Sequence, residues 1–173
     1  ETKKAGTGIE FRRISKIGLE GGFGSVTLGR DLTASYMAVS RYDVFGDIGV
    51  GASLAWNAVN TGYNARCENT LSYYTPTISG FRAGINYGFG EKTQARDSRY
   101  VGVGLAYDNG PISVGFGYDR NNNVALGKNA GGTSLASLEV DMKTWHLGGS
   151  YNFGVAKVAA FYKETENVAV NTD

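Results

Sequence analysis

The stretch Ile112-Ser-Val-Gly-Phe-Gly-Tyr-Asp119 decides the fold class, because large apolar residues alternate in it with glycine and polar residues. A period of two is typical of a β-strand whose two faces meet different surroundings. No segment shows a sustained helical period with capping residues, so any helix should be short and confined to loops. The same alternation predicts eight strands, at residues 10–20, 24–30, 66–75, 81–89, 99–108, 112–119, 143–153 and 155–163.

The connections between the predicted strands alternate strictly between short and long. The short ones are rich in glycine and in Asn-Gly pairs, which supply the backbone angles of tight hairpins. Short turns at one rim and long loops at the other are typical of outer-membrane barrels. The short connections are 21–23, 76–80, 108–111 and 152–154, and the long ones are 31–65, 90–98, 120–142 and the tail from 164.

The face opposite the apolar residues is made of small side chains. Gly102, Gly104 and Ala106 alternate with the apolar residues of 101–105, whereas a face in water would carry Lys, Glu and Thr. Small residues suit a crowded or curved barrel interior. Aromatic residues gather toward both strand ends, as in the two girdles of a membrane barrel, although an ordinary antiparallel core with aromatic rims remains an alternative. They are Tyr73, Phe81, Tyr107, Tyr151 and Phe153 toward the short turns, and Phe89, Tyr100, Tyr118, Trp145 and Tyr162 toward the long loops.

Composition narrows the function classes. The 173-residue chain has 17 Lys and Arg against 16 Asp and Glu, a net charge of +1 that gives no electrostatic basis for binding nucleic acid. Its one cysteine, Cys67, and one histidine, His146, cannot form a structural zinc site, so we expect no metal or other cofactor. No apolar run approaches the ~18 residues of a membrane helix. His146 shares a predicted inner face with Thr144 and Ser150, which favours a structural role, so the sequence predicts no enzyme.

Two features oppose a closed eight-stranded barrel. Side chains fill the interior of such a barrel, which leaves no room for the connection 31–65. An even number of antiparallel strands also puts both ends of the chain on the long-loop rim, whereas bacterial barrels keep them at the short-turn rim. We therefore expect the chain to be the middle of a larger barrel, with the remaining strands supplied by another segment or a second chain.

Five stretches carry a family resemblance in their order along the chain: FRRISKIGLEGGFGSVTLGRD (11–31), RCENTLSYYTP (66–76), SGFRAGINYGF (79–89), AYDNGP (106–111) and SYNFGVAK (150–157). Together they resemble the trimeric general porins of Gram-negative outer membranes, of the betaproteobacterial type. The resemblance implies an all-β, transmembrane, antiparallel barrel of 16 strands, of which residues 1–173 hold the central eight as one partial domain. It also implies a homotrimer in outer-membrane lipid, with a water-filled channel for passive diffusion of ions and small hydrophilic solutes.

The resemblance also assigns roles to particular residues. The connection 31–65 would be the third loop of the family, which folds into the barrel and narrows the pore. Arg13 and Arg66 fall where the family places basic residues on the wall that faces this loop. Asp43 and Asp47 would be the acids of the loop, so that opposed charges create a transverse field across the constriction.

Alternation gives its own candidates for the pore wall. Arg66 shares a face with Thr70 and Ser72, and Arg82 and Lys157 also share parity with small or polar neighbours. All three are therefore expected to point inward. The wall is then biased positive, and the channel is predicted to favour anions weakly.

Two other architectures remain open from the sequence. An eight-stranded structural or adhesin barrel would explain the strand count but neither the chain ends nor the length of 31–65. A soluble β-sandwich binding module would require the aromatic face to be buried inside. Extraction behaviour separates them, since only a membrane barrel should require detergent.

Overall fold

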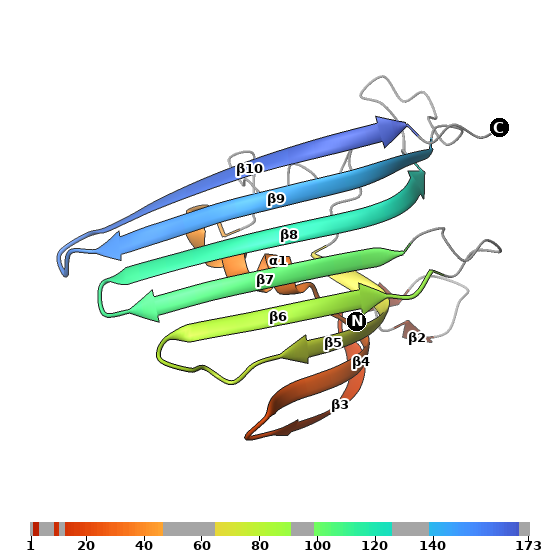
Figure 1. Cartoon of the computed structure of the whole chain (residues 1–173), viewed down its shortest axis with the longest axis horizontal. Helices are drawn as coiled ribbons and strands as arrows, with labels where there is room; N and C mark the ends of the chain where they lie inside the picture. The colour runs from red at the N-terminus through yellow and green to blue at the C-terminus, as the bar shows by residue number, and fades with distance from the viewer. Residues whose placement is uncertain are drawn as a thin grey trace.

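The computed structural model describes residues 2–3, 9–10, 13–46, 65–90, 99–125 and 139–169. Eight antiparallel strands form one sheet, in which each strand is hydrogen-bonded to its neighbours in the sequence (Figure 1). They are β3 (Ser15–Gly21), β4 (Gly24–Leu32), β5 (Arg66–Tyr74), β6 (Phe81–Gly88), β7 (Tyr100–Asn109), β8 (Ile112–Ala125), β9 (Glu139–Asn152) and β10 (Lys157–Ala169). A separate two-stranded ladder joins β1 (Thr2–Lys3) to β2 (Ile9–Glu10).

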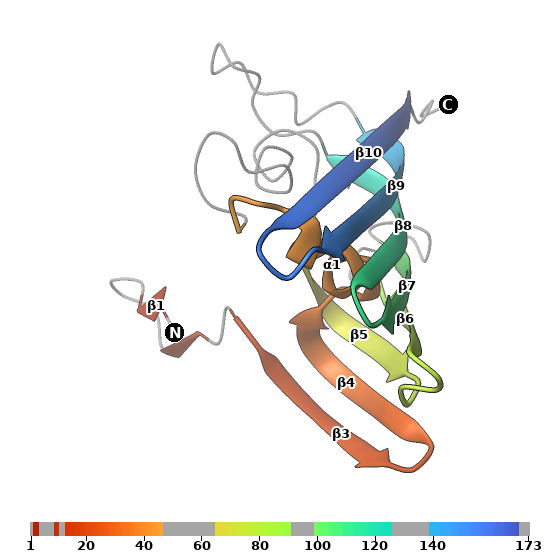
Figure 2. The same ribbon diagram turned by 90° about the vertical axis from the view of Figure 1, so that its left-hand side faces the viewer.

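The large sheet is an open, curved wall. Its strand order runs from β10 to β3 without closing, so within the described residues β3 and β10 are edges that do not pair with each other. The predicted eight strands and the all-β class are confirmed, and a closed eight-stranded barrel is excluded for this sheet. Figure 2 shows the curvature, with the short helix α1 (Ala34–Val39) on the concave side. Among the described residues no helix is long and apolar enough to cross a membrane.

The two faces of the sheet differ as alternation predicted. On the convex face Leu105 and Leu147 are 48% and 47% exposed, whereas Ala106 and His146 on the concave face are 8% and 0% exposed. Aromatic rings pair toward both ends of the convex face, at centroid distances of 4.3 to 5.1 Å. The pairs are Phe81–Tyr107 and Tyr151–Phe153 near the short turns, and Tyr87–Phe89 and Trp145–Tyr162 near the long loops.

Tyr100 is an exception among the predicted girdle residues. It shares the parity of Gly102, lies on the concave face and is only 2% exposed. Its hydroxyl donates to the buried carboxylate of Asp119. Its assignment to the outer girdle is therefore wrong, because that assignment used its position near a strand end and not its parity.

The strands β8, β9 and β10 run further toward the long loops than alternation predicted, and β3 begins later, at Ser15. Alternation fails after Arg120 because three asparagines follow, and asparagine is common in turns. In the structure the pairing continues instead. The Asn122 N–H donates to the Arg99 carbonyl at 2.9 Å, and the Asn122 side chain donates to Asp141 at 3.2 Å.

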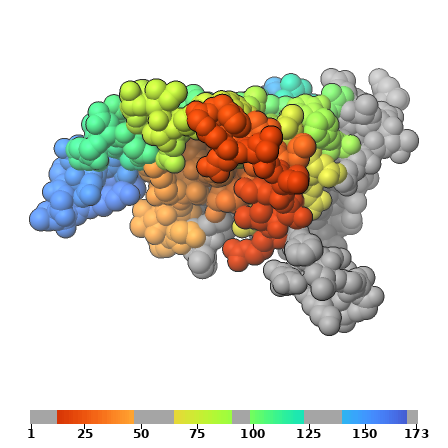
Figure 3. Space-filling model, turned by 90° about the horizontal axis from the view of Figure 1, so that it is seen from below, coloured from red at the N-terminus to blue at the C-terminus, as the bar shows by residue number. Residues whose placement is uncertain are grey.

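Glycines on the concave face let α1 and the following turn η1 (Ser40–Tyr42) dock directly on the strands. A Cβ atom at Gly104 would lie 2.0 Å from the Ala34 carbonyl oxygen, and one at Gly115 would lie 2.3 Å from the Ala38 carbonyl oxygen. Any larger residue would therefore displace the helix. Figure 3 shows this segment, in orange, seated under the arch of the strands. The small residues of the concave face are thus explained by the chain segment that packs on them.

Candidate functional site

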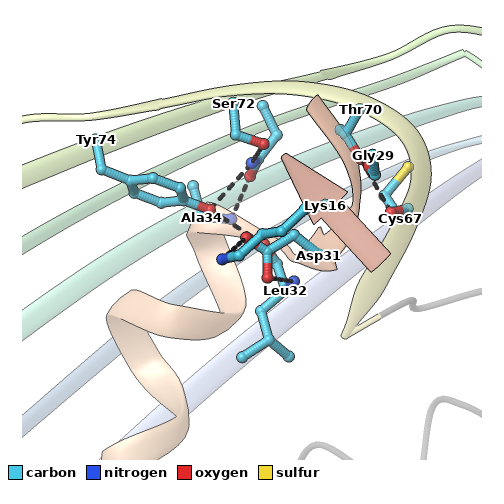
Figure 4. Close-up of polar contacts among 10 residues, drawn as sticks. Lys16, Gly29, Asp31, Leu32, Ala34, Cys67, Thr70, Ser72 and Tyr74 are labelled. Carbon is cyan, nitrogen blue, oxygen red and sulfur yellow. Dashed lines mark hydrogen bonds and ion pairs between the residues drawn. The ribbon is translucent and has the colours of Figure 1, made fainter. Parts of the chain in front are cut away.

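The segment that follows β4 is fixed to the wall at its root. The Lys16 ammonium of β3 lies 2.5 Å from a carboxylate oxygen of Asp31, which is 5% exposed. The Leu32 N–H donates to the other Asp31 oxygen at 2.8 Å, and the Tyr74 hydroxyl donates to the Leu32 carbonyl at 3.1 Å (Figure 4). These contacts hold the chain where it leaves the strand for the concave face.

Asn86 of β6 holds the first turn of α1. Its side-chain oxygen accepts a hydrogen bond from the Ala34 N–H, one of the helix donors that has no partner within the helix. Its side-chain nitrogen donates to the Ser72 hydroxyl at 2.6 Å and to the Tyr74 hydroxyl at 3.1 Å. Asn86 is 1% exposed, so these bonds are shielded from water. One side chain therefore joins two strands of the wall to the helix.

Asp119 of β8 is a second buried anchor for the same helix. One carboxylate oxygen accepts from the Ser35 hydroxyl at 2.6 Å and from the Tyr100 hydroxyl. The other lies 3.0 Å from Nε2 of His146, which is fully buried on β9. The carboxylate thereby connects α1 to β7, β8 and β9. His146 is in contact with this anchor, in keeping with the structural role that the sequence favoured.

The end of the helical segment is held by charged groups. Both Arg41, from η1, and Arg82, from β6, donate to the same carboxylate oxygen of Asp108, at 2.9 and 3.0 Å. The other Asp108 oxygen accepts from the Ser113 hydroxyl at 2.7 Å. The Tyr42 hydroxyl lies 2.8 Å from the Ser113 hydroxyl. This cluster lies at the short-turn end of β7 and β8.

A hollow of about 250 Å³ lies between α1 and the concave side of the wall. The cationic groups of Lys16 and Arg82 line it together with Asp31, several hydroxyl groups and the apolar side chains of Met37 and Ala106. A lining of this kind can hold water and small polar solutes beside the helix. The remaining lining residues are Ser25, Thr27, Ala34, Ala38, Tyr74, Thr75, Ala83, Gly84 and Gly104.

The predicted basic residues of the wall lie in different surroundings. Arg82 is on the concave face and lies next to the helical segment, through the Asp108 carboxylate that it shares with Arg41. Lys157 is the first residue of β10 and is exposed. Arg13 is exposed and lies two residues before β3. Of the three, the structure brings only Arg82 into the cluster that contacts the helical segment.

Arg66 is placed by a feature that alternation missed. The register pairs Thr70 with Gly29 but Cys67 with Asp31, so β5 contains a bulge, at which Asn69 has a φ of 47°. A Cβ atom at Gly88 of the concave face would lie 2.7 Å from the Cys67 sulfur, so Cys67 shares that face. Arg66 then alternates to the opposite face. Because the bulge shifts the alternation by one residue, parity no longer supports an inward Arg66, and its place in the pore wall stays a prediction of the family resemblance.

The structure describes one of the two predicted acids of the loop, Asp43. Asp43 directly follows η1 and is 8% exposed, and one of its carboxylate oxygens accepts from the Phe45 N–H at 3.0 Å. Asp43 therefore stabilises the turn that ends the helical segment. Asp47 lies outside the described residues.

The anchors of the helix were not among the predicted site residues. Asn86 and Asp119 appeared in the sequence only as polar members of glycine-rich faces, that of Asn86 shared with Arg82. A large polar side chain on such a face is a usable signal, since a buried polar group needs a partner that the small residues cannot supply. Lys16 gave no comparable signal, because its strand has no clean apolar face.

Comparison with known proteins identifies the family. Residues 1–173 match the Gram-negative porin family. The chain is 37% identical over 169 residues to Outer membrane porin protein 32 of Delftia acidovorans, and 32% identical over 177 residues to an outer membrane porin protein of Bordetella pertussis. These matches cover 92% and 90% of this chain but 45% and 42% of the relatives, so it spans a little less than half of their length.

A solved structure agrees with this match. The anion-selective porin from Comamonas acidovorans superposes with a TM-score of 0.77 at 36% identity, over 94% of this chain and 48% of that chain. The open antiparallel wall with a helical segment on its concave side therefore corresponds to part of a porin barrel. The chain belongs to the family of Gram-negative porins.

Proposed function

We propose that the chain supplies wall and constriction to a passive diffusion channel for ions and small hydrophilic solutes, with a weak preference for anions. As a Gram-negative porin it lies in the outer membrane. The observation that carries the proposal is the helical segment α1–η1, fixed on the concave face by the buried side chains of Asn86 and Asp119. A rigid segment inside a curved wall narrows the passage that the wall encloses. No chemistry on the solute is part of this function.

The open edges support a larger assembly. Backbone groups at the free edges of β3 and β10 would be costly in lipid, where every such group needs a partner. We therefore propose that further strands complete the barrel, and that the complete channel is a homotrimer embedded in outer-membrane lipid. The apolar side chains on the convex face of β3, Ile17 and Leu19, are 77% and 74% exposed and are available to such an assembly.

The charges near the helical segment support the preference for anions. Lys16, Arg41 and Arg82 lie on or against the concave face and share two carboxylates, those of Asp31 and Asp108, whereas the carboxylates of Asp43 and Asp119 beside the same segment are buried. Arg13, Arg66 and Lys157 stay candidates for the same role, with Asp43 and Asp47 as opposing acids of the loop 31–65. The similarity to a porin described as anion-selective supports this sign.

Planar-bilayer recording of the porin that contains this chain tests the proposal. We expect stable conductance steps and, in a salt gradient, a reversal potential on the anion side. Replacing residues 34–46 with a short Gly-Ser linker should raise the conductance, because the constriction is gone. A matched control replaces Asn109-Gly110 of the short turn with Gly-Gly and should leave the conductance unchanged. Equal conductance of the linker variant and the unmodified porin would show that the segment does not narrow the pore.

A further inference from the structure

The hollow between α1 and the wall presents both apolar and polar groups to its contents. Met37 and Ala38 of α1 form an apolar surface, which Ala106 of β7 continues. Ser25 and Thr27 of β4 supply hydroxyl groups. The volume of about 250 Å³ is that of about eight molecules of liquid water, which is room for one small organic solute. Met37 is 47% exposed, so the hollow is open on the concave side of the wall.

An ion pair lines the hollow beside the start of α1 (Figure 4). The Lys16 ammonium lies 2.5 Å from a carboxylate oxygen of Asp31, and the two side chains are 39% and 7% exposed. An ammonium group has three donors and a carboxylate about four acceptor sites, so both keep hydrogen-bonding capacity after they pair. A hydroxyl group donates and accepts, so it can bond to the cation and to the carboxylate of such a pair at the same time. Neighbouring hydroxyls on one solute therefore match this ion pair better than an isolated hydroxyl does.

Two further polar side chains of the wall, Thr75 and Arg82, line the same space. The Thr75 hydroxyl accepts from the Ala83 N–H at 2.9 Å, which leaves its own proton to donate elsewhere. The Arg82 side chain is 48% exposed and has donors besides the one that bonds to Asp108. The hollow therefore offers donors and acceptors at several places around one apolar surface.

The charges of the hollow favour a neutral solute over an anion. Lys16 is paired with Asp31 and Arg82 with Asp108, so a free anion would compete with a carboxylate for either cation. Asp31 is 5% exposed, and a buried carboxylate that loses its partner is costly. A neutral hydroxylated solute adds hydrogen bonds without displacing either carboxylate. The proposed preference of the lumen for anions is a long-range effect and needs no anion in the hollow.

We propose that the hollow binds a neutral, polyhydroxylated ring of monosaccharide size, with its C–H face against α1 and its hydroxyl groups toward β4 and the Lys16–Asp31 pair. Binding of this kind makes the passage of such solutes saturable, whereas free diffusion rises in proportion to their concentration. The inference rests on the proposed channel only in that the lumen must bring the solute to the hollow.

The test measures the binding of two neutral probes to the purified porin in detergent by saturation-transfer NMR. The first probe is myo-inositol, a cyclohexane ring with a hydroxyl group on every carbon. The second is cyclohexane-1,4-diol, which has the same ring but no neighbouring hydroxyls. We expect myo-inositol to bind with a Kd of about 1–10 mM, a weak affinity for a ligand of its size. The diol should bind at least about tenfold more weakly, because it forms fewer hydrogen bonds.

The Ser25→Ala/Thr27→Val variant removes two hydroxyl groups of the hollow with little change in side-chain size. It should bind myo-inositol about tenfold more weakly than the unmodified porin, and each single variant about threefold more weakly, as expected for the loss of two and of one hydrogen bond. The affinity for the diol should change much less. Thr77→Val is the matched control, because Thr77 is exposed in a short turn and does not line the hollow. It should bind myo-inositol as the unmodified porin does.

Equal affinity for the two probes, or equal affinity of the double variant and the unmodified porin for myo-inositol, would overturn the proposal. A third probe, cyclohexanecarboxylate, separates a neutral site from an anion site. If this anion displaces myo-inositol and binds more tightly, the hollow belongs to the anion path and the proposal is also overturned. Conductance of the unmodified porin is recorded separately in planar bilayers. Normal conductance without binding of myo-inositol rejects only this inference, whereas binding without conductance rejects only the proposed channel.

Discussion

The two ends of the helical segment are fastened to the wall by different chemistry. At its start, Asn86 and Asp119 are 1% and 4% exposed and bond to Ala34 and Ser35. At its end, the Arg41 side chain is 32% exposed where it pairs with Asp108. A buried group that loses its partner costs about 1–3 kcal/mol, whereas an exposed ion pair contributes about 0–1 kcal/mol. The buried hydrogen bonds at the start should therefore contribute more to stability than the ion pair of Arg41 at the end, where the buried Tyr42 also packs.

The largest effect is expected from Asp119→Ala. This change removes the acceptor of the Ser35 and Tyr100 hydroxyls and the partner of His146, all of which are buried. We expect a loss of about 3–5 kcal/mol in stability and a noisier open channel, because several buried groups lose their partners together. The heat-unfolding midpoint and single-channel noise measure the two effects.

Asp108→Ala is the comparison for this variant, since it removes the acceptor at the other end of the segment. It should lower the unfolding midpoint much less. Equal unfolding midpoints for the two variants would show that the buried anchor and the exposed anchor contribute equally to stability.

The second largest effect is expected from Gly104→Ala. The new Cβ would lie 2.0 Å from the Ala34 carbonyl oxygen, so the start of α1 must move away from the wall. Overpacking of this kind costs about 1–3 kcal/mol. The unfolding midpoint should fall and the conductance should change, because the helix shifts in the lumen. Gly149→Ala is the control, since its Cβ would meet only the Ser113 oxygen, at 3.6 Å. An unchanged conductance in Gly104→Ala would argue against a fixed helix.

A smaller effect is expected from Arg41→Gln, at the exposed anchor. The pair with Asp108 is reached by water and salt, so stability should change by less than about 1 kcal/mol. Open-channel noise is the sharper measurement. In the unmodified porin it should rise between about 0.1 and 1 M salt, as the ion pair is screened. In Arg41→Gln the noise should be high at both salt concentrations. If the noise of this variant still rises with salt, the ion pair between Arg41 and Asp108 is not the contact that limits the movement of the helical segment.

The sheet could be predicted from the sequence because alternation and turn residues are local properties. Most of the eight strands show them without reference to the others, although the strand of Lys16 has no clean apolar face. The bulge at Asn69 could not be predicted in this way, because a positive φ at a residue other than glycine depends on the register with β4. The bulge shifts the register of Cys67 and Arg66 by one residue relative to uninterrupted alternation.

The anchors show a second limit of the sequence. Asn86 and Asp119 are 52 and 84 residues away from the helix residues that they bind. Periodicity placed both side chains on the inner face but could not name their partners. Only the fold shows that polar residues of the wall form hydrogen bonds with α1. It also shows that the basic residues Lys16 and Arg82 line the hollow beside this helix.

The smallest effect is expected for ion selectivity. Its measurement compares basic side chains that contact the helical segment with basic side chains away from it. Arg82 lies in the Asp108 cluster, whereas Arg13 precedes β3 and is exposed, and Arg66 lies beyond the bulge of β5. Arg82→Gln should shift the reversal potential in a salt gradient toward cations, because arginine keeps its charge at any ordinary pH. The Arg13→Ala/Arg66→Ala double variant should shift the reversal potential in the same direction, because the family resemblance implies that both residues line the ion path. The shifts should be largest near 0.01 M salt, where the Debye length is about 30 Å, and vanish near 1 M, where it is about 3 Å. A double variant that leaves the potential unchanged at low salt would remove Arg13 and Arg66 from the pore wall and leave Arg82 as the basic residue that acts there.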